Sequence, residues 1–225
     1  MKKKLLIILL LFFTTVSFAQ NDTTRLAKIS RNRYAFALVP SAARNIYGIA
    51  IGPVGSEAIC NLTYTRYSHG LNLQIPGQGF LQVFYINKTG FGETEQTPES
   101  DSLAYYDTLP VRAVHNGLMF SPFGTFTPIV NGISLSLFMS LGQTVNGVSI
   151  NTFWNLYNKI NGVAIGAVNI VWTMKGVQIG LVNKTTELHG LQFGLWNKNQ
   201  KRSLPFLNWN FKKDEKHQQQ VRGFR

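Results

Sequence analysis

Between residues 117 and 197 apolar positions alternate with small or polar ones in a phrase that returns at a nearly fixed interval. The phrase is complete in Gly176-Val-Gln-Ile-Gly-Leu-Val-Asn183 and is nearly repeated over residues 190–197. Its copies follow one another after 15, 15, 15, 14 and 14 residues and begin at Gly117, Gly132, Gly147, Gly162, Gly176 and Gly190. Local alternation is typical of β-strands, and a fixed period indicates a repeat architecture. We therefore predict an all-β repeat protein with these glycines at the turns.

Outside this sector the pattern is looser. Earlier copies begin at Gly48 and Gly70, 22 residues apart. Residues 87–112 break the pattern and hold half of the acidic residues. Because these acids lack EF-hand spacing, they predict a solvated insertion rather than a calcium site. Residues 204–211 form a closing unit in which Pro205 suits an edge strand. We expect one all-β domain over residues 34–211.

Two architectures accommodate a unit of 14 or 15 residues. In a β-solenoid each unit is one coil that buries apolar surface against the next coil, and equivalent Asn side chains hydrogen-bond as a ladder. In an antiparallel outer-membrane β-barrel each unit is a strand and a turn, with the apolar residues facing lipid. Such short units leave no room for the long loops of these barrels, so the solenoid is favoured and the barrel is the alternative. The solenoid predicts that Val177, Ile179, Leu181 and Leu188 point inward, that Gln178 points outward, and that Asn183 lies at a corner.

The full phrase at residues 176–183 resembles the bacterial surface-repeat family, whose units read Gly-[Val/Leu]-Gln-Ile-Gly-[Leu/Ile]-[Val/Ile]-Asn. Residues 190–197 match it nearly as well, whereas Asn151, Thr152 and Ala167 depart from it in earlier units. The resemblance implies an exported protein of the envelope or cell surface. It supplies no catalytic residues.

The N-terminus has the parts of a secretory signal peptide. Three lysines precede an apolar run from Leu5 to Phe13 and an exit of small residues, which predicts a signal peptide over residues 1–19 and a flexible leader over 20–33. The apolar run is shorter than the roughly 20 residues that a membrane-spanning helix needs. We expect export through the secretory pathway to the outer membrane, the cell surface or the periplasm. Cys60 is the single cysteine, so it forms no intramolecular disulfide, and we interpret it as a small buried side chain.

The formal net charge is +12, and much of the excess lies near the C-terminus, where residues 212–225 are predicted to form a basic tail. The matching partner of an exported basic protein is outer-membrane lipid, lipopolysaccharide or another envelope protein, and not nucleic acid. A solvated tail that only keeps the protein soluble is the alternative. The candidate contacts with an anionic surface are Lys198, Lys201, Arg202, Lys212 and Lys213.

The sequence contains no motif for catalysis or for a cofactor. It has no HExxH helix, no zinc-type cysteine pair, no phosphate-binding glycine loop and no nucleophile elbow. His69 and His189 directly precede a repeat glycine, and His115 lies one residue further back. This placement indicates either a metal or proton-handling row or, more simply, polar residues suited to turns. We predict a non-catalytic protein without a cofactor, in a structural or binding role. The alternative is an integral outer-membrane barrel, such as a small pore.

One set of aromatic residues admits two interpretations. These side chains form either an exposed stripe that contacts carbohydrate or lipid, or ordinary core filling and capping. The set consists of Phe153, Trp154, Tyr157, Trp172, Trp196 and Trp209.

Overall fold

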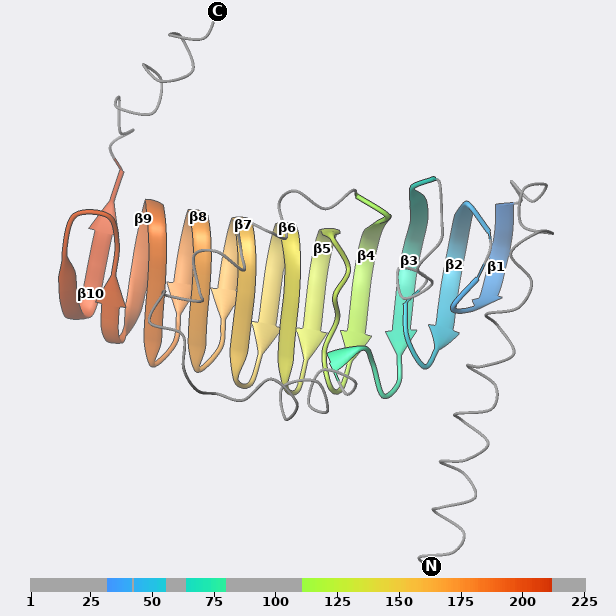
Figure 1. The fold of residues 1–225 in the computed structure, drawn as a ribbon, viewed down its shortest axis with the longest axis horizontal. Helices are drawn as coiled ribbons and strands as arrows, with labels where there is room; N and C mark the ends of the chain where they lie inside the picture. The colour runs from blue at the N-terminus through green and yellow to red at the C-terminus, as the bar shows by residue number, and fades with distance from the viewer. Residues whose placement is uncertain (1–31, 42, 56–63, 80–110, 212–225) are drawn as a thin grey trace, which may run out of the picture.

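The computed structural model describes residues 32–41, 43–55, 64–79 and 111–211. They form one sheet of ten strands whose order in space is their order in the sequence (Figure 1). The strands are β1 (Asn32–Leu38), β2 (Asn45–Gly52), β3 (Arg66–Gln74), β4 (Ala113–Ser121), β5 (Ile129–Ser136), β6 (Met139–Asn151), β7 (Trp154–Ile165), β8 (Val168–Ile179), β9 (Val182–Lys198) and β10 (Ser203–Asn210). Within these ranges no helix has the length and hydropathy needed to cross a bilayer.

Strands β1 to β9 pair in parallel, each with the strand of the next repeat. The repeat glycines are register partners throughout, from Gly48 and Gly70 to Gly176 and Gly190. For consecutive strands to pair in parallel, the chain must travel once around and return to the same side in each unit. The protein is therefore a β-solenoid, which confirms the favoured prediction. The alternative of an antiparallel barrel is wrong.

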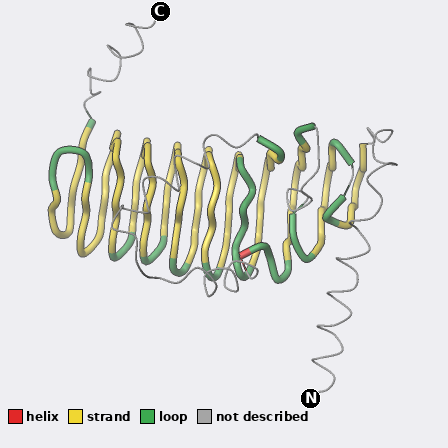
Figure 2. Tube along the Cα trace, in the orientation of Figure 1, coloured by secondary structure: helices red, strands yellow, loops and turns green. Residues whose placement is uncertain are grey.

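Each coil consists of two walls, which we describe for the reference unit of residues 176–189. The glycine wall comprises the repeat glycine and the three residues after it, which end β8 at Ile179. A turn at residues 180–181 follows, and the opposite wall starts with β9 at Val182 (Figure 2). No turn separates the opposite wall from the next glycine wall, because β9 continues to Lys198.

The six repeat glycines lie inside strands, which corrects their predicted location at turns. Their φ angles lie between +134° at Gly176 and +156° at Gly190. A Cβ at Gly176 would lie 2.0 Å from the carbonyl oxygen of Gly162 in the preceding coil. Only a residue without a side chain combines this backbone conformation with this close stacking. The glycines therefore bend a continuous strand from one wall into the other, and the turn proper follows at Gly180.

The predicted orientation of the glycine wall is wrong, because its side chains face the other way. Gln178 is 0% exposed, whereas Ile179 is 42% exposed and Leu181 is 55% exposed. Leu188 is buried as predicted, and Asn183 lies next to the turn at residues 180–181 with its side chain buried. Alternation divides a strand into two faces without showing which face is inside. In this solenoid the amides face inward because amides in register can hydrogen-bond to one another along the sheet.

The predicted asparagine ladder is present inside the solenoid. Asn155 donates to Asn169, Asn169 to Asn183, and Asn183 to Asn197, each over 2.7 Å. The same amides donate to carbonyl oxygens at the turn, as Asn169 does to Ile179 over 3.0 Å. Each of Asn155, Asn169 and Asn183 therefore links its own coil to the turn of the next coil. An apolar column on the opposite wall completes the core and includes Val130, Val145, Ile160, Met174 and Leu188.

The C-terminal end is closed by β10, which pairs antiparallel with β9. The loop between them reaches across the last coil, where the backbone N–H of Leu188 donates to Oε1 of Gln200 over 3.0 Å. Pro205 lies in β10, an edge strand of the described residues, as predicted for a closing unit. At the other end β1 begins at Asn32, so the first strand includes two residues that we had assigned to the leader. The predicted signal peptide, basic tail and Cys60 lie outside the described residues, as does the insertion except for Val111 and Arg112.

Candidate interaction face

The outward side of the glycine wall is apolar in all ten strands. In each strand the side chains one and three residues after the repeat glycine face outward. Stacked in register, they form two columns along the wall. The first runs from Phe36 in β1 to Trp209 in β10, and the second runs from Leu38 to Leu207. Every residue in both columns is apolar and none is buried. With strands about 4.8 Å apart, these columns extend over roughly 43 Å. Monomeric soluble proteins rarely expose an apolar surface of such continuity.

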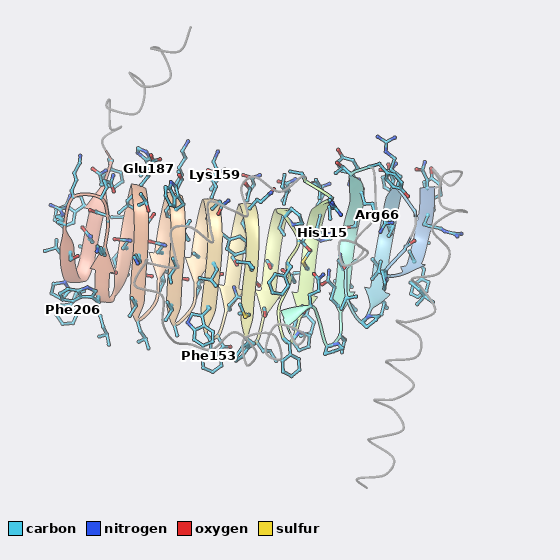
Figure 3. The ribbon with its side chains drawn as sticks, in the orientation of Figure 1. Arg66, His115, Phe153, Lys159, Glu187 and Phe206 are labelled. Atoms are coloured by element: carbon cyan, nitrogen blue, oxygen red, sulfur yellow. The ribbon has the colours of Figure 1, made fainter. Side chains whose placement is uncertain are left out.

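A ridge of exposed apolar side chains follows the turns along one edge of this wall. Figure 3 shows Phe153 and Phe206 on this edge of the molecule. Phe138 packs against Phe153 and Trp154, with ring centroids 5.4 and 5.6 Å apart. We call this edge the turn ridge. Its exposed members are Ile75, Phe123, Leu137, Phe153, Trp154, Leu181, Val182, Leu195, Trp196 and Phe206.

The opposite edge, where the strands bend at the glycines, is polar. The residues before four successive repeat glycines form an outer amide ladder in which Asn131, Asn146 and Asn161 each donate to the preceding asparagine over 2.6 to 2.7 Å. Lys175 and His189 continue this column in β8 and β9. Figure 3 shows Lys159 and Glu187 on the same edge. We call it the polar edge. It lies across the glycine wall from the turn ridge.

The described residues carry a large excess of positive charge. Ten of them are Lys or Arg, whereas Glu187 is the only acidic one. The predicted contacts Lys198, Lys201 and Arg202 are exposed and lie together at the C-terminal end. Arg202 lies 4.2 Å from the ring centroid of Trp209 and donates through Nη2 to its carbonyl oxygen over 3.0 Å. The other predicted contacts, Lys212 and Lys213, lie outside the described residues.

The three histidines near repeat glycines do not form one row. His69 and His189 lie on the polar edge, and His69 stacks on Tyr47 with ring centroids 4.8 Å apart. His115 lies one position earlier and is buried, with Nδ1 2.8 Å from Oγ of Ser68. Burial lowers the pKa of His115 to about 4, so this side chain is neutral at pH 7. Among the described residues no three His, Cys, Asp or Glu side chains are grouped for metal binding.

A small cavity lies near His115, lined in part by Arg66, Ser68 and Asn72. Its volume is about 20 Å³, which is room for a water molecule and not for an organic substrate. Tyr157 is also buried, and its burial raises the pKa of the phenol, while facing hydroxyls such as that of Ser149 oppose the rise. Both groups belong to the interior.

The aromatic residues divide between the two interpretations. Tyr157 is part of the core, while Phe153, Trp154, Trp196 and Trp209 are exposed on the turn ridge or the glycine wall. Trp172 is half-buried on the opposite wall. The outward residues of that wall in the reference unit are polar, and Thr173 donates to Glu187 over 3.2 Å. In the reference unit the exposed apolar surface is thus confined to the glycine wall and the turn ridge, whereas the preceding coil also has Ile170 and Trp172, both half-buried, on the opposite wall.

The glycine wall and the turn ridge were not identified as a surface from the sequence. The sequence did contain a signal for the orientation of this wall at the third position of the repeat, two residues after the glycine. Polar side chains recur there in register as Ser134 and Ser149 and as Gln178 and Gln192. Their inward orientation forces the flanking apolar residues outward. No family model, curated protein or solved structure matches the chain, so its function is inferred from its own residues.

Proposed function

We propose that the protein is a non-catalytic, exported repeat protein of the bacterial cell envelope with a structural or binding role at the outer membrane. The observation that carries this proposal is the apolar outer surface of the glycine wall, which continues through all ten strands. An apolar surface of this length is costly in water and promotes aggregation, so it is suited to contact with a partner.

The charge and the N-terminal sequence support an envelope location. Ten basic residues against one acidic residue in the described part favour an anionic surface as partner. Residues 1–19 have the basic head, apolar run and small-residue exit of a secretory signal. The resemblance of residues 176–183 to surface-repeat units points in the same direction.

The placement of the ionisable groups favours a binding role over catalysis. General acid–base catalysis requires groups that can reach a substrate. His115 is buried, His69 is stacked on Tyr47, and Glu187 accepts a hydrogen bond from Thr173. We therefore assign the interior polar groups to stability and the apolar outer surface to function.

Fractionation of a bacterium with an outer membrane tests this proposal. We expect the tagged full chain to appear in the envelope fraction, to have lost residues 1–19, and to be released by alkaline carbonate as a peripheral protein is. A Leu9→Arg variant, which breaks the apolar run of the signal, should keep its full length and stay in the cytoplasm. A wild-type chain that stays in the cytoplasm with residues 1–19 attached would contradict the proposal.

A further inference from the structure

The glycine wall and the turn ridge form one continuous apolar surface. In the reference unit, the outward residue Ile179 is followed two positions later by the ridge residue Leu181, and both are exposed. The same relation holds one coil later for Phe193 and Leu195. The surface therefore extends from the wall around the turn, and the ridge is its most protruding part.

The backbone at Phe206 shows that the ridge is maintained even at the end of the solenoid. Phe206 has a φ of +62°, which disfavours residues with a Cβ, and it follows a shift of register against β9. Its side chain is 72% exposed, so packing does not explain this conformation. The shift of register indicates a β-bulge, which allows this conformation and re-aims the side chain outward. The conformation adds an aromatic ring to the ridge.

Charge distinguishes the two occupants that suit such a surface. A second copy could pack its own glycine wall against this one, but each copy brings ten basic residues and one acidic residue among those described, so two copies repel each other. A bilayer containing anionic phospholipid offers both an apolar interior and a negative surface, and it attracts the same charges. The charge therefore favours lipid over a second copy.

The distribution of residue types across the surface matches a membrane interface. Aliphatic side chains and Phe form the wall and much of the ridge, and Trp196 and Trp209 lie near the C-terminal end, as Trp does at the level of lipid headgroups. Arg202 stacks on Trp209, and Lys198 and Lys201 are exposed beside it. Lys159 and Lys175 lie on the polar edge, at the other border of the wall. Interfacial elements bury an apolar face and keep cations at the headgroups in the same way.

Resting on the envelope role proposed above, we propose that the glycine wall and the turn ridge dock the protein onto a bilayer of anionic phospholipid. The turn ridge enters the boundary between headgroups and acyl chains. Lys198, Lys201, Arg202 and the lysines of the polar edge contact the phosphate groups. The protein lies on the membrane without crossing it.

Flotation of the purified mature chain with lipid vesicles tests the docking. The vesicles contain phosphatidylcholine alone or phosphatidylcholine with 30% phosphatidylglycerol. We expect the protein to bind the anionic vesicles at least tenfold more tightly, with the preference shrinking at high salt. The double variant Lys198→Gln/Lys201→Gln should weaken binding to the anionic vesicles about threefold.

A matched pair of variants tests the assigned face. Leu181→Ser/Leu195→Ser removes two exposed ridge residues and should weaken binding at least tenfold. Trp172→Thr removes an aromatic ring from the opposite wall and should change binding less than twofold. The Phe206→Gly variant controls for misfolding, because glycine readily adopts the φ of +62° at this position. This variant should fold as well as the wild type and still bind several-fold more weakly.

Three outcomes would overturn the docking proposal. The first is a wild-type protein that binds neither kind of vesicle. The second is equal loss of binding in the ridge pair and in Trp172→Thr. The third is a wild-type dimer that the ridge variant converts to monomer without any vesicle binding, because it would identify a second copy as the occupant. None of these outcomes contradicts the envelope role if cell fractionation still finds the protein in the envelope. The envelope role is contradicted only if fractionation finds the protein in the cytoplasm.

Discussion

Gln178 and Ile179 are neighbours in the chain, and they lie on opposite faces of the glycine wall. Gln178 is fully buried and accepts a hydrogen bond from Gln192 over 2.7 Å, while Ile179 is exposed. The same contrast holds between the inward column that includes Ser134, Ser149 and Gln178 and the apolar columns on either side of it. Near the C-terminal end the interior of this wall thus carries hydrogen bonds between neighbouring strands, from Asn208 to Gln192 and from Gln192 to Gln178. In earlier coils Met119 and Ala164 occupy the same inward column, and the exterior is apolar throughout.

The difference shows how a polar interior can be stable. An amide has both a donor and an acceptor, so each member of a ladder satisfies its neighbours when the coils are in register. A buried amide without a partner costs far more than a satisfied one gains. The interior therefore requires every coil to keep its register, whereas the exterior sets no such requirement. Replacing inner and outer residues in pairs separates these two roles.

The largest effect is expected at the glycine bend. A Gly176→Ala variant places a Cβ on a residue with a φ of +134°, 2.0 Å from the carbonyl oxygen of Gly162. Its free energy of unfolding should fall by about 4 kcal/mol or more, or the protein should fail to fold. Val177→Ala, on the outer face beside it, should cost about 1 kcal/mol or less. Equal denaturation midpoints for the two variants would contradict the assignment of Gly176 to a bend.

The two asparagine ladders provide the next comparison. Asn169→Ala removes the two buried bonds to Asn155 and Asn183 and the bond to the carbonyl oxygen of Ile179, so we expect a loss of about 3 kcal/mol. Asn146→Ala on the polar edge also breaks two ladder bonds, but water replaces them, and the loss should be about 0.5 kcal/mol. Urea denaturation measures both values. Equal losses of unfolding free energy in the two variants would contradict a greater contribution of the interior ladder to stability.

Acid should lower the stability of the fold, because His115 is buried. In the unfolded chain His115 binds a proton below its ordinary pKa of 6.5, whereas in the folded protein its pKa is about 4 because it is buried. The unfolded state therefore binds more protons between these values, and stability falls by about 2 kcal/mol from pH 7 to pH 5. His115→Gln should flatten this slope. A slope that is unchanged in His115→Gln would count against this source of pH dependence.

The smallest effect on stability is expected on the outer surface. Ile179→Ser should lower the free energy of unfolding by about 1 kcal/mol or less, because this residue is 42% exposed. The same variant should weaken binding to anionic vesicles several-fold. Val171→Ser, in the interior, serves as the control and should cost about 3 kcal/mol. A large loss of stability in Ile179→Ser would mean that the outer face serves folding rather than binding.

The period of the sequence was sufficient to predict the all-β class of fold. It left the choice between parallel coils and an antiparallel barrel open, although the short unit favoured the solenoid with its asparagine ladder. It could not predict which face of the glycine wall is inside, because the alternation of Val177, Gln178 and Ile179 is compatible with both orientations. We placed the apolar residues inside, since burial of apolar surface is the usual rule. The rule failed here because side chains that form ladders fill the interior. The glycines were misplaced for a related reason, since a fixed spacing identifies a constrained backbone position without distinguishing a turn from a bend within a strand.

The candidate surface was only partly visible in the sequence. Lys198, Lys201 and Arg202 were identified from the charge near the C-terminus, and the structure places them at the end of the apolar surface. The turn ridge was missed because its members come from turns that are 14 or 15 residues apart, such as Leu181 and Leu195. They align only once the coils are stacked in register.

The central claim is that the glycine wall faces the membrane and the opposite wall does not. Two proteins with a single tryptophan test it on vesicles made of brominated phospholipids that include phosphatidylglycerol. One carries Ile179→Trp with the four native tryptophans changed to Phe, and the other keeps only Trp172 on the opposite wall. We predict that bromine quenches the fluorescence at position 179 at least threefold more strongly than at position 172. Equal quenching at the two positions, or stronger quenching at position 172, would contradict the account.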